Sequence, residues 1–206
     1  VLSELYRVVK QGGVVVWVVG DATIKGSETG TSFRQALYAK DVGFRLHDTM
    51  IYLKDQLAYP DTNRYYNAFE YMFVLSKGKP KTVNLIKDKK NKSFGRTVSG
   101  KGRQADGTSK DRTRANEPYA EYGVRWNYWL IYNQKRGIET QHPAIFPEQL
   151  AHDHIISWSN ENDTVLDPFA GSGTTGVACQ NLNRKFILME QEPEYVEIIK
   201  QRLLDN

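Results

Sequence analysis

The apolar positions in the first third of the chain alternate between helical and strand periodicity. Leucine and valine recur at helical spacing before Gly12-Gly13, and the β-branched run VVVWVV follows at once. A continuous run of this kind is typical of a strand buried on both faces of a sheet. The pattern predicts, in order, a helix from residue 2 that stops at Gly12-Gly13, a strand at 14–22, a helix at 30–43, and strands at 44–55 and 69–78 that could form an antiparallel hairpin at the sheet edge.

The middle of the chain loses this periodicity and the last third regains it. Residues 77–121 are rich in Gly, Ser, Lys and Arg, which predicts an exposed, partly mobile excursion. In the last third of the chain, the apolar pattern predicts a helix that starts at Pro147, a strand at 163–169, a helix at 174–183, a strand at 185–190 and a helix at 192–204. Alternating helices and strands of this kind indicate an α/β fold.

Composition narrows the class of protein. With 40% hydrophobic and 25% charged residues the chain is typical of a soluble globular protein, and we expect it in the cytoplasm. The longest apolar run, Val14 to Val19, is far shorter than the roughly 20 residues that a membrane helix needs. The single cysteine, Cys179, excludes an internal disulfide, and the four histidines show no metal-ligand spacing, so no metal is expected.

The net charge of +4 is distributed unevenly along the chain. Between Lys77 and Glu117 there are 13 Lys or Arg residues against 4 Asp or Glu, whereas the rest of the chain carries 15 basic and 20 acidic residues. All of the excess positive charge therefore belongs to one segment. Such a segment is either a solvated loop or a surface for a polyanion.

The stretch DTVLDPFAGSGTTG, residues 163–176, contains the spacing G-x-G-x-x-G between a predicted strand and a predicted helix. Backbone N–H groups and a helix N-terminus at the end of a strand favour an adenosine-type cofactor, and Glu190 ends the next strand where a carboxylate can bind ribose hydroxyls. The alternative is a tight turn beside a surface glutamate.

The residues around these glycines distinguish between cofactors. Asp167 can receive an ammonium group, Phe169 can pack on a ligand, and three hydroxyls at the helix start suit a carboxylate: Ser172, Thr174 and Thr175. An ammonium, a carboxylate and a ribose together describe S-adenosylmethionine better than a dinucleotide pyrophosphate.

At these residues the chain resembles a known family. HPAIFPEQL, DTVLDPFAGSGTTGVA and NRKFILMEQEPEYVEIIKQRL are similar to the cofactor half of the β-group S-adenosylmethionine-dependent DNA amino-methyltransferases, which modify adenine N6 or cytosine N4. LYRVVKQGGVVVWVV, GFRLHDTMIYLKD and NAFEYMFVLSKGKPK resemble the later sheet strands of that family, and the last of these looks most like phage- or prophage-type adenine enzymes. Only the basic stretch lacks a firm counterpart.

The resemblance implies a fold, a domain organisation and a set of cofactor-binding residues. The fold is a Rossmann-like methyltransferase sheet with its N-terminal strands missing and a basic, loop-rich insertion. Residues 1–76 are expected to form sheet strands and helices of the core, 77–121 a target-recognition insertion, and 122–206 the cofactor-binding half. The expected cofactor-binding residues are Asp167, Pro168, Phe169, Gly171, Ser172, Gly173, Thr174, Thr175, Glu190, His142, Pro143, Ala144 and Phe146.

The family's catalytic segment has no counterpart among these residues. Enzymes of this family use a motif of the type [DNS]-P-P-[YFW] to bind the target amine, and none of the seven prolines of this chain is adjacent to another. We expect the motif before Val1, so that no catalytic residue is assigned and the 206 residues alone are inactive.

The family likeness favours DNA as the partner of the basic segment. The expected phosphate-binding residues are Lys87, Lys89, Lys90, Lys92, Arg96, Lys101, Arg103, Lys110, Arg112 and Arg114. Five aromatic residues could stack on a displaced base, although core packing is the commoner role for such residues: Tyr65, Tyr66, Trp126, Tyr128 and Trp129. Double-stranded DNA is the expected partner, without a membrane, and the likeness is compatible with a homodimer and with a companion restriction endonuclease.

The leading functional hypothesis is methyl transfer from S-adenosylmethionine to an exocyclic amine of a DNA base, with adenine N6 favoured over cytosine N4. A catalytically dead DNA-binding remnant is a second hypothesis. An NAD-dependent oxidoreductase is allowed by the glycine spacing but disfavoured by the Asp-Pro-Phe before it.

Overall fold

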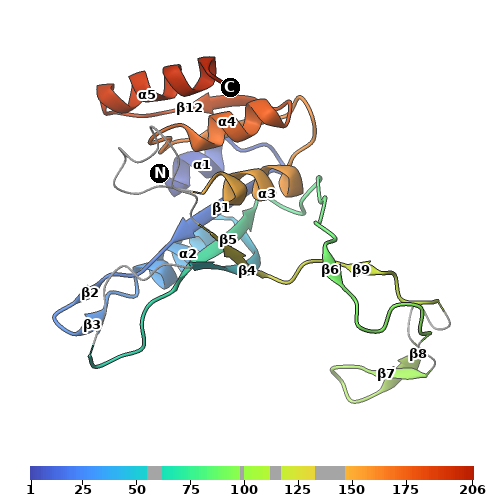
Figure 1. Ribbon diagram of the computed structural model, residues 1–206. Helices are drawn as coiled ribbons and strands as arrows, with labels where there is room; N and C mark the ends of the chain where they lie inside the picture. The colour runs from blue at the N-terminus through green and yellow to red at the C-terminus, as the bar shows by residue number, and fades with distance from the viewer. Residues whose placement is uncertain (55–61, 98–99, 112–116, 133–146) are drawn as a thin grey trace. The chain divides into compact units, whose positions relative to one another are not determined.

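The structure is a computed structural model that describes residues 1–54, 62–97, 100–111, 117–132 and 147–206 (Figure 1). The chain forms two compact units. The first consists of residues 1–84 together with 127–206, and the second consists of residues 85–126. The sequence predicts core elements at 1–76, an insertion at 77–121 and a cofactor-binding half at 122–206. The second unit begins and ends later in the chain than this predicted insertion.

The first unit contains a mixed four-stranded sheet in the order β1-β5-β4-β10. β5 lies antiparallel to both of its neighbours, and β10 lies parallel to β4. The strands are β1 (Val14–Val19), β4 (Arg45–Lys54), β5 (Phe69–Ser76) and β10 (Tyr128–Ile131). The α/β class and the antiparallel pairing of β4 with β5 are confirmed.

The prediction that the VVVWVV strand is buried on both faces is confirmed in part, since Val15, Trp17 and Val19 pack against one hydrophobic cluster and Val14 and Val18 against another. β1 lies at one end of the four-stranded sheet, and all six of its residues are only half-buried. β5 pairs with a strand on each side, and its last five residues are buried. The hairpin of β4 and β5 is therefore internal rather than at the edge, because β1 pairs with the outer side of β5.

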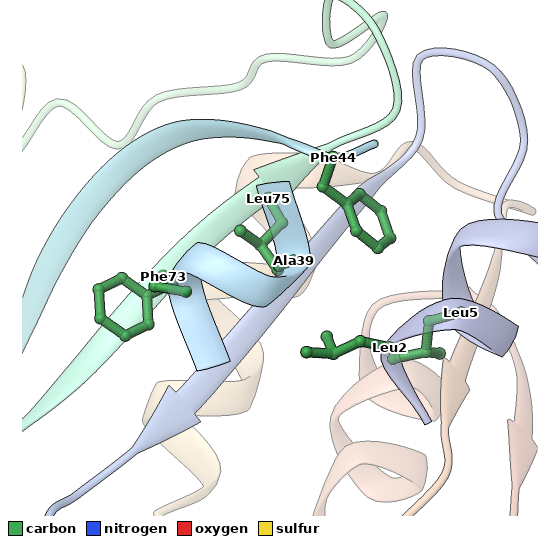
Figure 2. Packing of buried hydrophobic residues seen from close by; sticks show 7 residues of the cluster. Leu2, Leu5, Ala39, Phe44, Phe73 and Leu75 are labelled. Carbon is green, nitrogen blue, oxygen red and sulfur yellow. The ribbon is translucent and has the colours of Figure 1, made fainter. Parts of the chain in front are cut away.

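Successive residues of β5 point to opposite faces of the sheet and anchor two hydrophobic layers. Phe73 and Leu75 pack in one cluster with residues of α1 (Leu2–Val8) and α2 (Thr31–Val42), as Figure 2 shows. Met72 and Val74 belong to a second cluster, which includes Leu150 of α3 (Glu148–Trp158). The sheet is therefore covered by helices on both faces.

A smaller parallel pair of strands completes the first unit. β11 (Thr164–Asp167) pairs with β12 (Lys185–Leu188), and α4 (Thr174–Asn181) connects them. A third cluster buries Ile155 of α3 with Cys179 of α4, and burial raises the pKa of the Cys179 thiol to about 11. The final helix is α5 (Pro193–Leu204). The predicted β-loop-α-β-α order of this region is confirmed.

The second unit consists of β-ribbons that the sequence did not predict. β6 (Lys89–Lys90) pairs with β9 (Tyr122–Gly123), and backbone hydrogen bonds extend this pairing, for example from Arg125 N to Ile86 O. β7 (Lys101–Arg103) and β8 (Ser109–Asp111) form a separate hairpin. Short exposed strands such as these bury few apolar residues, so they leave almost no hydrophobic periodicity in the sequence.

Asp21 connects a small hairpin to the start of α2. The hairpin consists of β2 (Thr23–Ile24) and β3 (Ser27–Glu28). The Asp21 carboxylate accepts hydrogen bonds from the hydroxyls of Thr29, Thr31 and Ser32 and from the Ser32 N–H. These donors hold the pKa of Asp21 well below its usual range, and the bond to the Ser32 hydroxyl contributes most. Asp21 therefore caps α2 from outside the helix, where Gly30 at the N-cap offers no side chain.

We expect Asp21→Asn to lower the free energy of unfolding at neutral pH by about 1–3 kcal/mol, because a charged acceptor of several hydrogen bonds is lost. Since the pKa of Asp21 is lowered in the folded state, its stabilisation is complete above the unfolded-state pKa of about 4 and decreases as the pH falls below it. Urea unfolding of the unsubstituted chain and of Asp21→Asn over a pH series measures this difference in the free energy of unfolding. Asp41→Asn, an exposed substitution in the same helix, is the matched control. Equal pH dependence of the two variants would contradict the role of Asp21.

Candidate functional site

The glycine-rich loop and Glu190 lie at the same edge of the small parallel sheet. Asp167 is the last residue of β11 and is in register with Leu188, the last residue of β12. Two backbone hydrogen bonds continue the pairing beyond the strands, from Met189 N to Asp167 O at 2.9 Å and from Ala170 N to Met189 O at 3.0 Å. The carboxyl ends of parallel strands meet at this edge, which is where α/β proteins bind ligands.

Within the described residues, three backbone N–H groups hold the Glu190 carboxylate. One oxygen accepts a hydrogen bond from Gly171 N at 2.8 Å, and the other accepts from Gln191 N at 2.8 Å and Glu192 N at 3.1 Å. Glu192 is the N-cap of α5. A single half-buried carboxylate therefore joins the glycine loop to the start of the last helix.

Asp167 organises the other side of the loop. One oxygen of its carboxylate accepts a hydrogen bond from Phe169 N at 3.0 Å, and the other accepts from the Thr175 hydroxyl at 2.5 Å. The half-buried Pro168 lies within this turn. The backbone turn between β11 and α4 is thus closed by an acid at the end of the strand.

The hydroxyls of Ser172 and Thr174 are directed toward α5. Nη1 of Arg202 donates a hydrogen bond to the Ser172 carbonyl oxygen at 2.7 Å and is 3.1 Å from the Ser172 hydroxyl and 3.4 Å from the Thr174 hydroxyl. Both residues are buried. The sequence suggested that these hydroxyls bind a carboxylate, but it contained no signal for Arg202, because helical periodicity locates the inner face of α5 without identifying a polar contact on it.

The backbone conformation and the packing at position 173 both require glycine. Its φ of +85° lies in the left-handed region, and an added Cβ would be 3.0 Å from a side-chain carbon of Ile199. Gly173 is the N-cap of α4. Gly171, two residues earlier in the same loop, also has a positive φ, of +52°. The loop therefore approaches α5 closely, and its backbone turns sharply into α4.

Phe169 is the exposed residue of the loop. Its side chain is 63% exposed, and its ring meets the Trp17 ring edge-on at a centroid distance of 6.3 Å. The indole N–H of Trp17 donates to the Gln35 side chain of α2 at 2.7 Å. The contact links the loop to β1 of the larger sheet and leaves one surface of the Phe169 side chain available to a ligand. Sequence reasoning did not identify Trp17 at this position.

The remaining predicted cofactor residues are not part of the described structure. His142, Pro143, Ala144 and Phe146 lie outside the described residues. Over the ranges that are described, no group of three or more His, Cys, Asp or Glu side chains could hold a metal ion. Likewise, none of the helices in those ranges is long and apolar enough to span a membrane.

The predicted DNA-binding residues have different surroundings within the second unit. Nζ of Lys89 lies 4.4 Å from the centre of the Trp126 ring, and Arg125 forms an ion pair with Asp88 that lowers the pKa of that carboxyl. Arg112 and Arg114 lie outside the described ranges. The other predicted residues are exposed: Lys87, Lys90, Lys92, Arg96, Lys101, Arg103 and Lys110.

The five candidate aromatic residues also differ in burial and contacts. Trp129 is buried in the second hydrophobic cluster, so its role is core packing. Trp126 lies under Lys89 in the second unit. Tyr65, Tyr66 and Tyr128 are exposed.

The sequence matches one protein family over nearly its whole length. Residues 1–201 match N6_N4_Mtase, described as DNA methylase. The orphan methyltransferase M.BamHII of Bacillus amyloliquefaciens is 58% identical over 208 residues, which cover 98% of this chain and 78% of that protein. The type II methyltransferase M.SmaI of Serratia marcescens is 29% identical over 177 residues, which cover 85% of this chain and about half, 52%, of that protein.

Two solved structures share the fold. The cytosine-N4-specific PvuII DNA methyltransferase aligns with a TM-score of 0.71 at 24% identity, over 96% of this chain and 66% of that one. The M1.HpyAVI–SAM complex aligns with a TM-score of 0.66 at 24% identity, over 98% of this chain and 80% of that one. At this identity the likeness concerns the fold alone.

We expect Gly173→Ala to lower the free energy of unfolding by about 2–4 kcal/mol, because a left-handed φ and a contact with Ile199 both oppose a Cβ. Gly26→Ala is the matched control, since Gly26 has a similar φ of +78° and no atom within 4 Å of an added Cβ. This control isolates the backbone cost, about 1–2 kcal/mol. Thermal and urea unfolding measure both variants, and equal losses would show that loop packing against α5 contributes nothing.

Proposed function

The chain belongs to the N6/N4 DNA methylase family, and we propose that it binds S-adenosylmethionine at the loop after β11 for methyl transfer to an exocyclic amine of a DNA base. The observation that carries this proposal is the hydrogen bond between the Glu190 carboxylate and Gly171 N–H at the carboxyl ends of two parallel strands. It brings an adenosine-type glycine loop and an acid for ribose hydroxyls together.

The described residues fit this cofactor. Glu190 is oriented by backbone N–H groups, so its carboxylate is held at the end of β12 where ribose hydroxyls can donate to it. Asp167 supplies a carboxylate for an ammonium group, and the exposed side of Phe169 supplies an apolar surface. When bound, the cofactor supplies an activated methyl group on a sulfonium. The contribution of these residues is to position it.

The sequence suggested that the loop hydroxyls bind a carboxylate of the ligand, whereas this proposal gives them a structural role. Ser172 and Thr174 are bound by Arg202, and Thr175 donates to Asp167. They stabilise the loop conformation, while a carboxylate of the ligand interacts with the N-terminal end of α4 through backbone N–H groups. His142, Pro143, Ala144 and Phe146 stay predictions for the methionine end of the cofactor.

We infer that the residues that bind the target amine are not among these 206, since the chain contains no pair of adjacent prolines. A segment of the type [DNS]-P-P-[YFW] in a longer gene product would provide a hydrogen-bond acceptor for the amine and a ring for the flipped base. Adenine N6 is the proposed target and cytosine N4 the alternative. A homodimer and a companion endonuclease stay predictions.

The second unit is the proposed surface for double-stranded DNA. It contains 11 Lys or Arg residues and 5 Asp or Glu residues, whereas the first unit contains 17 and 19. Phosphate attraction from such a unit is independent of sequence and decreases as salt increases. A remnant without catalytic activity would retain this property, so DNA binding alone does not distinguish the two hypotheses.

We expect the chain to retain labelled S-adenosylmethionine, and an excess of NAD not to displace it. Glu190→Gln should weaken binding by roughly tenfold or more, because a charged acceptor is replaced by a neutral one. Glu197→Gln is the matched control, since Glu197 is an exposed residue of α5 paired only with Lys200 in the described structure. Equilibrium dialysis measures all three proteins. Displacement by NAD, or equal affinity of the two variants, would contradict the proposed site.

A second prediction concerns catalysis. We expect the 206 residues alone to transfer no methyl group to DNA, and a longer product that includes a [DNS]-P-P-[YFW] segment to do so. Transfer of label from S-adenosylmethionine to duplex DNA measures the activity, and mass spectrometry of the digested nucleosides distinguishes N6-methyladenine from N4-methylcytosine. If the longer product binds the cofactor and DNA but transfers no label, the chain is a remnant.

A further inference from the structure

The β7–β8 hairpin of the second unit is exposed on both of its faces. Every residue of its two strands is exposed except Gly102, which is half-buried, and the two strands form a sheet with no third strand within the described ranges. An isolated two-stranded hairpin is marginally stable in water and buries no core. Its side chains are therefore available to a partner.

The hairpin is nevertheless held in a defined shape. Gln104 N donates to Thr108 O at 2.7 Å, and Gly107 N donates to Gln104 O at 3.0 Å. The Asp106 carboxylate accepts hydrogen bonds from Thr108 N at 2.9 Å and from the Thr108 hydroxyl at 2.7 Å, which lowers the pKa of Asp106. Gly107 supplies the positive φ, +85°, that such a turn requires. The acid at the tip is thus directed into the turn.

The strand register assigns the side chains to two faces. Lys101 is opposite Asp111 and Arg103 is opposite Ser109, so these four residues share one face. Gly102 is opposite Lys110 on the other face. One face therefore combines a guanidinium, an ammonium, a hydroxyl and a carboxylate, which include the donors and acceptors that recognise base edges.

The basic residues of the hairpin differ from those of the β6–β9 ribbon. Lys89 packs on Trp126, and Arg125 pairs with Asp88, so both stabilise the ribbon itself. Within the described part of the chain, the side chains of Lys101, Arg103 and Lys110 make no hydrogen bond or ion pair. The hairpin presents its charges outward, whereas part of the ribbon's charge is used internally.

We propose that the β7–β8 hairpin enters the major groove of B-form DNA and that Arg103 recognises a guanine there. The proposal rests on the proposed function, which makes duplex DNA the partner of this unit. The major groove is about 12 Å wide and admits a two-stranded β-ribbon, and a guanidinium binds the O6 and N7 atoms of guanine through two parallel hydrogen bonds. The excess of basic over acidic residues in this unit supplies the phosphate attraction that keeps the hairpin in the groove.

The experiment selects preferred duplexes from a pool with a randomised centre, using the whole chain with sinefungin, an unreactive analogue of S-adenosylmethionine. Affinities are then measured for the preferred duplex and for duplexes with one base pair exchanged at a time. Arg103→Lys keeps the charge but loses the planar fork. We expect its affinity for the preferred duplex to fall about tenfold, while its affinity for the duplex exchanged at one G·C pair is unchanged.

Lys90→Gln is the control for charge alone, since Lys90 is an exposed residue of the β6–β9 ribbon. It should weaken binding to all duplexes equally and make the salt dependence shallower. An RNA duplex of the same sequence should compete poorly with the DNA, because the major groove of A-form RNA is too narrow for a ribbon.

Three results would overturn the proposal. Equal effects of Arg103→Lys and Lys90→Gln on every duplex would mean that the hairpin contributes only charge. Equal competition by RNA would exclude major-groove insertion. Duplex binding without any sequence preference would refute base recognition and leave DNA as the partner. If the unsubstituted chain retains no duplex under any salt condition, the DNA partner of the proposed function itself is wrong.

Discussion

The Glu190 carboxylate determines how the candidate site is assembled. Within the described residues its three backbone donors belong to the loop after β11 and to the first residues after β12, so one side chain reinforces the backbone hydrogen bonds between these two segments. A carboxylate that accepts several N–H groups is held firmly, since hydrogen bonds to charged groups are stronger than neutral ones. The interaction joins the loop to the start of α5, in addition to the hydrogen bond from Arg202 to the Ser172 carbonyl oxygen.

The two units differ in charge and in burial. The first unit buries three hydrophobic clusters and carries slightly more acidic than basic residues. The second unit consists of exposed β-ribbons with an excess of basic residues. A unit with a buried core can position a cofactor, while an exposed basic unit can attract a polyanion. The division agrees with a family whose members act on DNA.

Sequence reasoning succeeded where a local pattern has one physical cause. Helical spacing before Gly12-Gly13 predicted α1, and the glycines after Asp167 predicted the turn into α4. It failed where the outcome depends on neighbours distant in sequence. The run at β1 could not reveal that, among the described strands, β5 and not β1 has a neighbour on both sides. Nor could a motif identify Arg202 or Trp17, whose contacts with the loop depend on how α5 and β1 pack.

The geometry of the loop also bears on the choice between cofactors. A dinucleotide pyrophosphate would need the backbone N–H groups of the glycine loop as donors. Here Gly171 N–H already donates to the Glu190 carboxylate, and Asp167 places a second carboxylate at the start of the turn and binds Phe169 N–H. The Glu190 carboxylate suits the ribose of either cofactor, whereas the fixed Asp167 carboxylate would repel a pyrophosphate and could attract an ammonium. The loop therefore favours S-adenosylmethionine over NAD on electrostatic grounds, independently of the family match.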